Sequence, residues 1–184
     1  MTTGNFMAHL SDHATSDARR GDRRLEAPPP FRHAAGYTLE EAEIRLVLGA
    51  CYPAEPAMDQ VPAYSFHICV RCDGQRAGNI TLRVGHNDYV DRYIGNIGYH
   101  VDFPYRGRKF AARACRLVRA LALEHGMTML WITCNPENIP SRRTCEIVGA
   151  RYVETIAVPR DSDLYYRGDR LKRRYRWDLT DVPA

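Results

Sequence analysis

The stretch from Gly98 to Ala111 combines glycine, proline and basic residues at a point where one hydrophobic pattern replaces another. The alternation before it predicts a strand, and the spacing after it predicts a helix. The first N–H groups of a helix have no internal partner and carry about half a positive charge, so a pyrophosphate can bind there. Arg106, Arg108 and Lys109 add positive charge. The alternative interpretation is an ordinary strand–helix turn with solvated charges.

A second polar segment, from Asn135 to Ser141, follows a short apolar strand. Asn138 is a favoured N-cap residue, and Pro140 is tolerated in the first turn of a helix. The segment therefore predicts the start of a helix that runs to Gly149. Capping this helix is one role open to Asn138, contact with a ligand is another, and the two can coexist.

Together, the two segments resemble the GNAT superfamily of acyl-CoA N-acyltransferases over roughly residues 64–158. The resemblance implies an α/β (α+β) fold with a single mixed, mostly antiparallel central sheet flanked by helices. The residues that carry it are Arg106 to Ala111 for the R/Q-x-x-G-x-G/A loop, Asn135, Asn138 and Ser141 for the N-x-x-N-x-x-S segment, and Glu146 and Gly149 for a glutamate before a terminal glycine.

The resemblance further implies that acetyl-CoA is the co-substrate and that no metal takes part. The backbone from Tyr99 to Val101 would hydrogen-bond the pantetheine arm, and amides from Gly107 to Ala112 would hold the pyrophosphate. Asn138 would reach the pantetheine, with Ser141 close by. The expected cofactor-binding residues are Tyr99, His100, Val101, Arg106, Gly107, Arg108, Lys109, Phe110, Ala111, Ala112, Asn138 and Ser141.

This chain departs from the family pattern at three positions. Lys109 stands where the family usually has glycine, which costs on the order of 1 kcal/mol if φ is positive. If φ is negative, Lys109 instead provides a cation that faces the phosphates. Many members have a glutamate base where this chain has Thr133 and a tyrosine acid where it has Cys145. Neither catalytic group can therefore be transferred to this chain.

The catalytic residues stay unassigned, with His100, Asp102, Asn135 and Cys145 as candidates and Glu137 as a further proton acceptor. A regular pleat places His100 and Asp102 on the same face. The leaving thiolate has a conjugate acid of pKa about 8.5 and needs little help from an acid. A backbone N–H near Val101 would stabilise the oxyanion. Cys145 is expected at most to donate a proton, because it lies beside Glu146 and has no histidine nearby in the sequence.

The expected function is transfer of an acetyl group from acetyl-CoA directly to a primary amine of a small molecule or peptide. The alternative is a degenerate acyl-CoA-binding or regulatory module without turnover. In the superfamily the acceptor binds around the first strand and the connection that follows it. Here that connection, residues 51–61, is short and rich in proline. The helices usual there are reduced, or are replaced by the N-terminal tail.

Composition is typical of one soluble globular domain: 184 residues, 45% hydrophobic and 26% charged, with a net charge of +4. These values exclude a fibrous or wholly disordered chain. No apolar run approaches the roughly 18 residues of a membrane span, and residues 1–10 do not resemble a secretory signal. Six cysteines without framework spacing predict a reduced, cytoplasmic protein. Cys69-x-x-Cys72 has no second cysteine pair at zinc-finger spacing, so these cysteines are expected to be structural. The sequence leaves a homodimer open.

The basic and aromatic residues between Arg167 and Arg176 have two interpretations, a nucleic-acid-binding strip and a solvated edge strand. Aspartates on both sides and the low total charge favour the edge strand, so no nucleic-acid partner is expected.

Along the chain, residues 1–36 are polar and contain Pro28–Pro30, which predicts a flexible tail before a domain at 37–184. Residues 38–50 are ambiguous: Thr38–Glu41 resemble a capping box, whereas Ile44, Leu46 and Leu48 alternate as in a strand. Residues 51–62 are predicted as loop. The next predictions are a meander of strands at 64–70, 77–84 and 93–102, with tight turns at 73–74 and 87–88. A helix follows from 110 and is closed by Gly126. The last predictions are a strand at 127–134, a helix to 149, a strand at 151–158 and an edge strand at 171–179.

Overall fold

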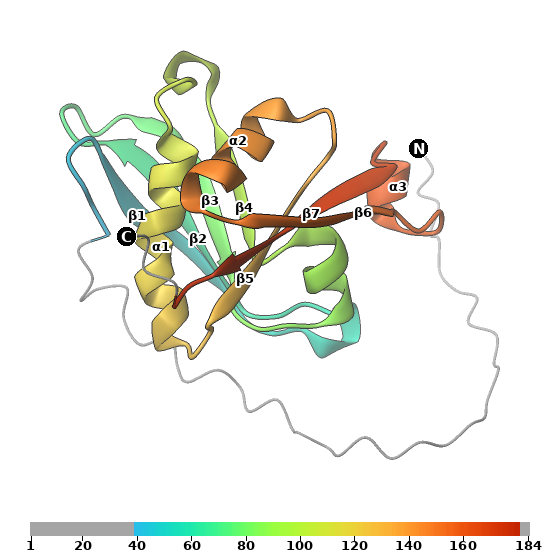
Figure 1. The fold of residues 1–184 in the computed structure, drawn as a ribbon. Coiled ribbons are helices and arrows are strands. Elements are labelled where there is room, and N and C mark those ends of the chain that lie inside the picture. Colours follow the sequence, from blue (N-terminus) through green and yellow to red (C-terminus); the bar gives the residue numbers. More distant parts are fainter. Residues whose placement is uncertain (1–38, 181–184) are drawn as a thin grey trace, which may run out of the picture.

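The computed structural model describes residues 39–180, except for the side chain of Pro56, and has a central sheet of seven strands (Figure 1). The tail predicted at 1–36 lies outside the described residues. The seven strands lie in the order β1-β2-β3-β4-β5-β7-β6, and of the six neighbouring pairs only β4 and β5 are parallel. The strands are β1 Ile44–Tyr52, β2 Ala63–Val70, β3 Arg76–Arg83, β4 Ile97–Val101, β5 Met129–Cys134, β6 Arg151–Ala157 and β7 Leu171–Asp178. The mixed sheet with flanking helices confirms the predicted fold class.

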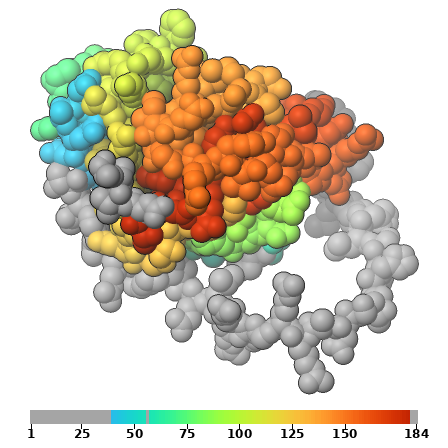
Figure 2. Space-filling model, in the orientation of Figure 1, coloured from blue at the N-terminus to red at the C-terminus, as the bar shows by residue number. Residues whose placement is uncertain are grey.

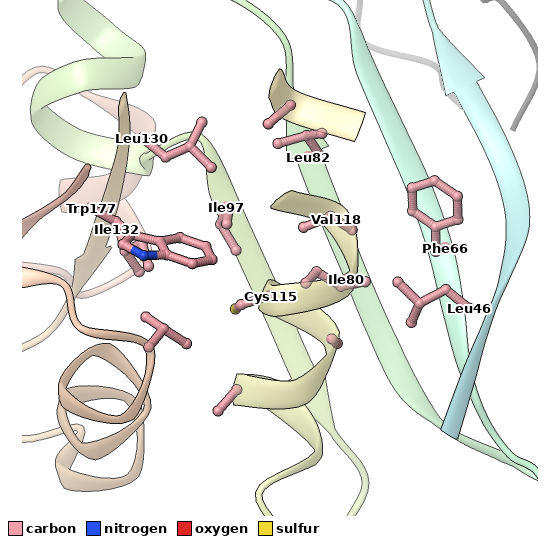
Figure 3. Close-up of a cluster of buried hydrophobic side chains, with 14 of the residues drawn as sticks. Leu46, Phe66, Ile80, Leu82, Ile97, Cys115, Val118, Leu130, Ile132 and Trp177 are labelled. Carbon is pink, nitrogen blue, oxygen red and sulfur yellow. The ribbon is translucent and has the colours of Figure 1, made fainter. Parts of the chain in front are cut away.

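Two helices, α1 (Phe110–Glu124) and α2 (Ile139–Val148), cover one face of this sheet. The apolar stripe of α1 packs against alternate residues of the strands beneath it, and Figure 3 shows Cys115 and Val118 beside Ile80 and Leu82 of β3. Burial of this stripe, rather than helix propensity, is what stabilises a helix of this length. Shorter helical turns lie at η2 (Pro56–Met58), η3 (Val90–Ile94), η4 (Phe103–Tyr105) and α3 (Asp163–Tyr166).

The ambiguous segment before residue 50 forms strand β1. Ile44 and Leu46 are buried in the core, so the alternation of apolar residues prevails over the helical signal. The residues just before β1 contact the start of α1: Arg113 forms ion pairs with Glu41 (2.8 Å) and Glu43 (2.7 Å). These contacts tie the first strand to the helix that begins beside the candidate site.

The strand predicted at 93–102 is shorter in the structure, and the tight turn before it is absent from the described chain. Residues 90–94 form the helical turn η3, and β4 begins only at Ile97. Asn87, which looked like a hairpin residue, accepts a hydrogen bond from the Val90 N–H (2.8 Å) and so starts this turn. The β2–β3–β4 meander is antiparallel, as predicted.

The last strand is not an edge strand, contrary to the prediction. β7 lies between β5 and β6, where Tyr175 and Trp177 are buried in the core. β6 forms that edge of the sheet instead, and most of its residues are exposed. Figure 2 shows that α2 and β6 (orange) cover much of the face in view. Because the aromatic residues of β7 are buried, they do not form the surface that a nucleic-acid strip requires.

Candidate active site

Strands β4 and β5 separate almost as soon as they meet. Their only Cα pairing is Ile97 with Ile132, and β4 then diverges from the end of β5. Buried Asn96 holds this geometry: its side chain accepts from the Trp131 N–H (2.8 Å) and donates to the Gly85 carbonyl (2.8 Å). On the other side, the Thr133 hydroxyl donates to the Tyr93 carbonyl (2.8 Å). The opening is therefore held by the side chain just before β4 and by one on β5.

A cavity of about 670 Å³ lies where β4, the loop at 105–109 and the first turns of α1 and α2 meet. This size is within the range of ligand-binding clefts. The residues that line it are Tyr99, His100, Val101, Tyr105, Arg106, Gly107, Lys109, Phe110, Ala111, Asn138, Ile139, Pro140, Ser141, Arg143, Thr144 and Ile147.

Most of the residues predicted to bind a cofactor line this cavity, and the structure brings both motif segments to it. Two predicted residues do not line it. Arg108 pairs with Glu43 (Nη2 to Oε2, 3.1 Å) and its guanidinium lies over the Phe110 ring. Ala112 is buried within α1. Arg106 does line the cavity, and its Nε donates to the Val101 carbonyl (3.0 Å).

The loop before α1 has a left-handed backbone at two residues, which are separated by Arg108. Gly107 has φ +81°, and Lys109, the N-cap of α1, has φ +61° and ψ +20°. The sequence left two options for Lys109, and the structure shows the strained one. The Lys109 side chain makes no capping hydrogen bond, so the first N–H groups of α1 receive no side-chain acceptor from their N-cap. Such N–H groups can bind an anion.

Asn138 caps α2, as one of its two predicted roles requires. Its Oδ1 accepts from the Ser141 N–H (3.1 Å). Ser141 in turn connects α2 to β4, because its Oγ lies 2.8 Å from the Tyr99 hydroxyl. Burial raises the pKa of Tyr99 far above its usual value. The phenol is therefore neutral and acts as a hydrogen-bonding group in the wall of the cavity.

The four catalytic candidates lie in three different environments. His100 lines the cavity, and its Nε2 lies 3.3 Å from Asp102 Oδ1; the two side chains are 59% and 45% exposed. Asn135 is engaged elsewhere: it donates to Asp169 and accepts from Lys172 (2.8 Å). Burial opposes the charge of Asp169, but hydrogen bonds from Lys172 and Asn135 outweigh it and lower its pKa. Glu137, in the connection between β5 and α2, is exposed.

Cys145 is fully buried and is not among the residues that line the cavity. Its thiol shares a hydrogen bond with Cys134, which raises the pKa of Cys145, and burial raises it further. The same hydrogen bond lowers the pKa of Cys134 to about 7. Cys145 is thus the thiol that keeps its proton.

Sequence reasoning missed six lining residues: Tyr105, Ile139, Pro140, Arg143, Thr144 and Ile147. The last four share one face of α2 at helical spacing, so the predicted helix already held a signal for them. In the structurally described part of the chain, no group of His, Cys, Asp and Glu is placed to hold a metal ion. Within residues 39–180, none of the helices has the length and apolar character needed to cross a membrane.

Comparison with known proteins agrees with this geometry. Residues 12–151 match the family model of the acetyltransferase (GNAT) domain, and the chain therefore belongs to this family. No curated protein matches the sequence significantly.

Several solved structures resemble the chain. The ribosomal-protein-S5-alanine acetyltransferase from Vibrio fischeri is 14% identical, with a TM-score of 0.51 over 66% of this chain and 64% of that one. RimJ from Mycobacterium smegmatis, solved in complex with CoA-disulfide, is 25% identical, with a TM-score of 0.48 over 66% and 56%. An acetyltransferase of the GNAT family from Bacillus anthracis is 19% identical, with a TM-score of 0.49 over 64% and 67%. The chain spans less than two thirds of the first two, and the Vibrio fischeri likeness shows the fold alone.

Proposed function

We propose that this protein transfers an acetyl group from acetyl-CoA to a primary amine. The observation that carries the proposal is the cavity beside the separated strands β4 and β5. The first residues of α1 also line this cavity. Membership of the GNAT family supports the same reaction class. The expected binding residues are those that line the cavity, so Arg108 and Ala112 contribute through the loop and helix they belong to rather than by direct contact.

In this arrangement, the N–H groups that follow Gly107 bind the pyrophosphate, and Arg106 and Lys109 add positive charge. The exposed backbone of β4 from Tyr99 to Val101 takes the pantetheine arm, since β5 has already turned away from it. Asn138 both caps α2 and contacts the arm. The thioester then lies where the strands separate.

The reaction itself is a direct displacement. The amine nitrogen attacks the thioester carbonyl carbon, and a backbone N–H near Val101 stabilises the oxyanion. The C–S bond breaks, CoA leaves as a thiolate, and the amine loses one proton. We assign this proton to His100, through water, because His100 lines the cavity and its Nε2 lies 3.3 Å from Asp102 Oδ1.

Cys145 takes no covalent part in this mechanism. A nucleophilic cysteine needs a thiolate, and the pKa of Cys145 is raised. The Cys145→Ala variant is therefore expected to retain turnover, and intact-mass spectrometry of the wild type with acetyl-CoA to show no acyl adduct. A stable adduct on Cys145, or ping-pong kinetics that the alanine variant loses, would contradict direct transfer.

Two measurements test the proposal as a whole. Calorimetry with acetyl-CoA should give saturable binding, and release of free CoA thiol should depend on an added amine. Absence of binding at millimolar acetyl-CoA would overturn the proposal. Binding without turnover on any amine would favour the second candidate, an acyl-CoA-binding module, which the replacement of the family's glutamate and tyrosine by Thr133 and Cys145 specifically supports.

A further inference from the structure

Arg83, the last residue of β3, lies on the face of the sheet opposite α1. Ile80 and Leu82 point into the core beside this helix, as Figure 3 shows. Since side chains alternate along a strand, Arg83 points to the other face. It is half-buried there, and burial lowers the pKa of its guanidinium.

Arg83 has few partners for a half-buried cation. Its Nη1 donates to the Gly95 carbonyl (3.2 Å), and no carboxylate within residues 39–180 lies at ion-pair distance. Two other half-buried arginines have carboxylate partners: Arg113 pairs with Glu41 and Glu43, and Arg174 pairs with Glu154. Arg119, Arg142 and Arg173 are bonded instead to a carbonyl or a tyrosine hydroxyl, and none of them lies against the backbone of β4 at Gly98 as Arg83 does. A half-buried guanidinium without a counter-charge favours the binding of an anion.

The position of Arg83 relates this anion to the reaction. A Cβ placed on Gly98 would lie 3.4 Å from Arg83 Nη1, so the guanidinium lies against the backbone of β4 at Gly98. Gly98 directly follows Ile97, the single residue of β4 that pairs with β5. The guanidinium is therefore next to the point at which the two strands separate, where the thioester would meet its acceptor.

Two chain connections border the same region. Tyr89 belongs to the β3–β4 connection, and burial is the main cause that raises its pKa. Asp163 also raises this pKa, whereas Arg167 and Arg83 lower it, so Tyr89 lies between Arg83 and the β6–β7 connection.

We propose that Arg83 binds a carboxylate of the acceptor, so that the acceptor is an amine with a carboxylate a few bonds from its reacting nitrogen. This inference rests on the proposed acetyl transfer and names the substrate class for it. The planar guanidinium binds a carboxylate through two parallel hydrogen bonds and so orients the amine as well as retaining it.

The test compares amino acids with their primary amides as acceptors. A panel of α-amino acids, β-alanine and 4-aminobutyrate is assayed beside the corresponding amides, for the wild type and for Arg83→Gln. Amides differ in amine basicity, so the quantity measured is the change in the carboxylate-to-amide ratio of kcat/KM between the two proteins. We expect this ratio to fall about 10- to 100-fold for the best acceptor, through KM.

A matched control comes from the same strand. Arg76 is exposed at the other end of β3, and Arg76→Gln is expected to leave the ratio unchanged. Arg83→Lys keeps the charge but loses the two-pronged geometry, so it should lower the ratio by a smaller factor. If Arg83→Gln melts at a much lower temperature than the wild type, Arg83→Lys still provides the test.

Calorimetry separates failure of this inference from failure of the proposed function. The same amino acids and amides are titrated into the wild type and into Arg83→Gln, each with and without CoA. Binding of acetyl-CoA together with turnover that ignores the carboxylate would overturn the role of Arg83 and leave the proposed function standing. The role of Arg83 would also be overturned if neither the amino acids nor the amides were acetylated and the amino acids did not bind. Absence of acetyl-CoA binding would overturn the proposed function, while carboxylate binding lost in Arg83→Gln would still support this site.

Discussion

Lys109 occupies a backbone conformation that glycine adopts more easily, since its φ is +61°. A side chain in this region costs on the order of 1 kcal/mol or more. We expect Lys109→Gly to be about 1 kcal/mol more stable than Lys109→Ala, measured by urea denaturation. Both variants lack the charge, so their difference reports the backbone alone. Equal stabilities would show that the loop relaxes to a negative φ.

The same strained residue bears on binding. Lysine at this position gives up stability and adds a cation to the cavity beside the start of α1. A residue whose backbone strain lowers stability while its charge serves binding is expected at a functional site rather than elsewhere in a fold.

Arg106 and Arg108 are close in sequence but differ in what they contact. Arg106 lines the cavity, whereas Arg108 pairs with Glu43. Arg106→Ala should weaken CoA binding about 3- to 5-fold, because an exposed charged contact contributes up to about 1 kcal/mol. Arg108→Ala is the matched control and should change affinity less than 2-fold in the same calorimetric titration. The reverse order would place the phosphates on the other side of the loop.

At the scale of elements, the interior place of β7 has a direct consequence for stability. Trp177 is 5% exposed, whereas Tyr152 of the edge strand β6 is 48% exposed. Trp177→Ala should lower the free energy of unfolding by about 3–5 kcal/mol. Tyr152→Ala should cost about 1 kcal/mol, since only part of its ring is removed from water. Urea denaturation of both variants checks the strand order, and similar small losses would contradict it.

Sequence patterns predicted the elements whose signals are local. The apolar stripe of α1 and the alternation of apolar residues in β2 each lie within one short stretch of sequence, and the structure shows both elements. The place of β7 was wrong because alternation indicates which face is buried and carries no information on neighbouring strands. The turn η3 was missed because Asn87 suits a hairpin and a helix start equally well.

Motif spacing indicated most of the residues that line the cavity for the same reason, since Arg106–Ala111 and Asn138–Ser141 each lie at the start of a helix. Arg83 could not be found in this way. Its significance depends on Gly98 and on the lack of a nearby carboxylate in the described chain, and both are relations between distant parts of the sequence.

At the scale of the whole molecule, stability should depend on pH through His125. Its Nε2 lies 2.8 Å from the Tyr64 hydroxyl; burial lowers the pKa of His125, and Glu124 opposes this only in part. Below about pH 6.5 the unfolded chain takes up a proton that the folded state resists, so stability falls as the pH decreases. We expect His125→Gln to lose less stability than the wild type between pH 6.5 and pH 5, measured by chemical denaturation.

The acidic groups with shifted pKa values do not interfere with this measurement. Hydrogen bonds and ion pairs lower the pKa of Asp169 and of Asp178, so their contribution is lost only as the pH falls through values below about 3.8. An identical decline in wild type and variant would show that His125 is protonated equally well in both states.

The buried Asn96 has a consequence for the kinetics of association. Because its amide joins the two strands at the base of their opening, the gap exists before any ligand arrives. A ligand that enters need not break strand pairing first, so encounter rather than conformational change should limit its arrival. In rapid mixing, the observed rate should then rise linearly with acetyl-CoA concentration. Asn96→Ala removes the bonds that fix the base of the two strands, so a conformational step should precede binding and introduce a plateau.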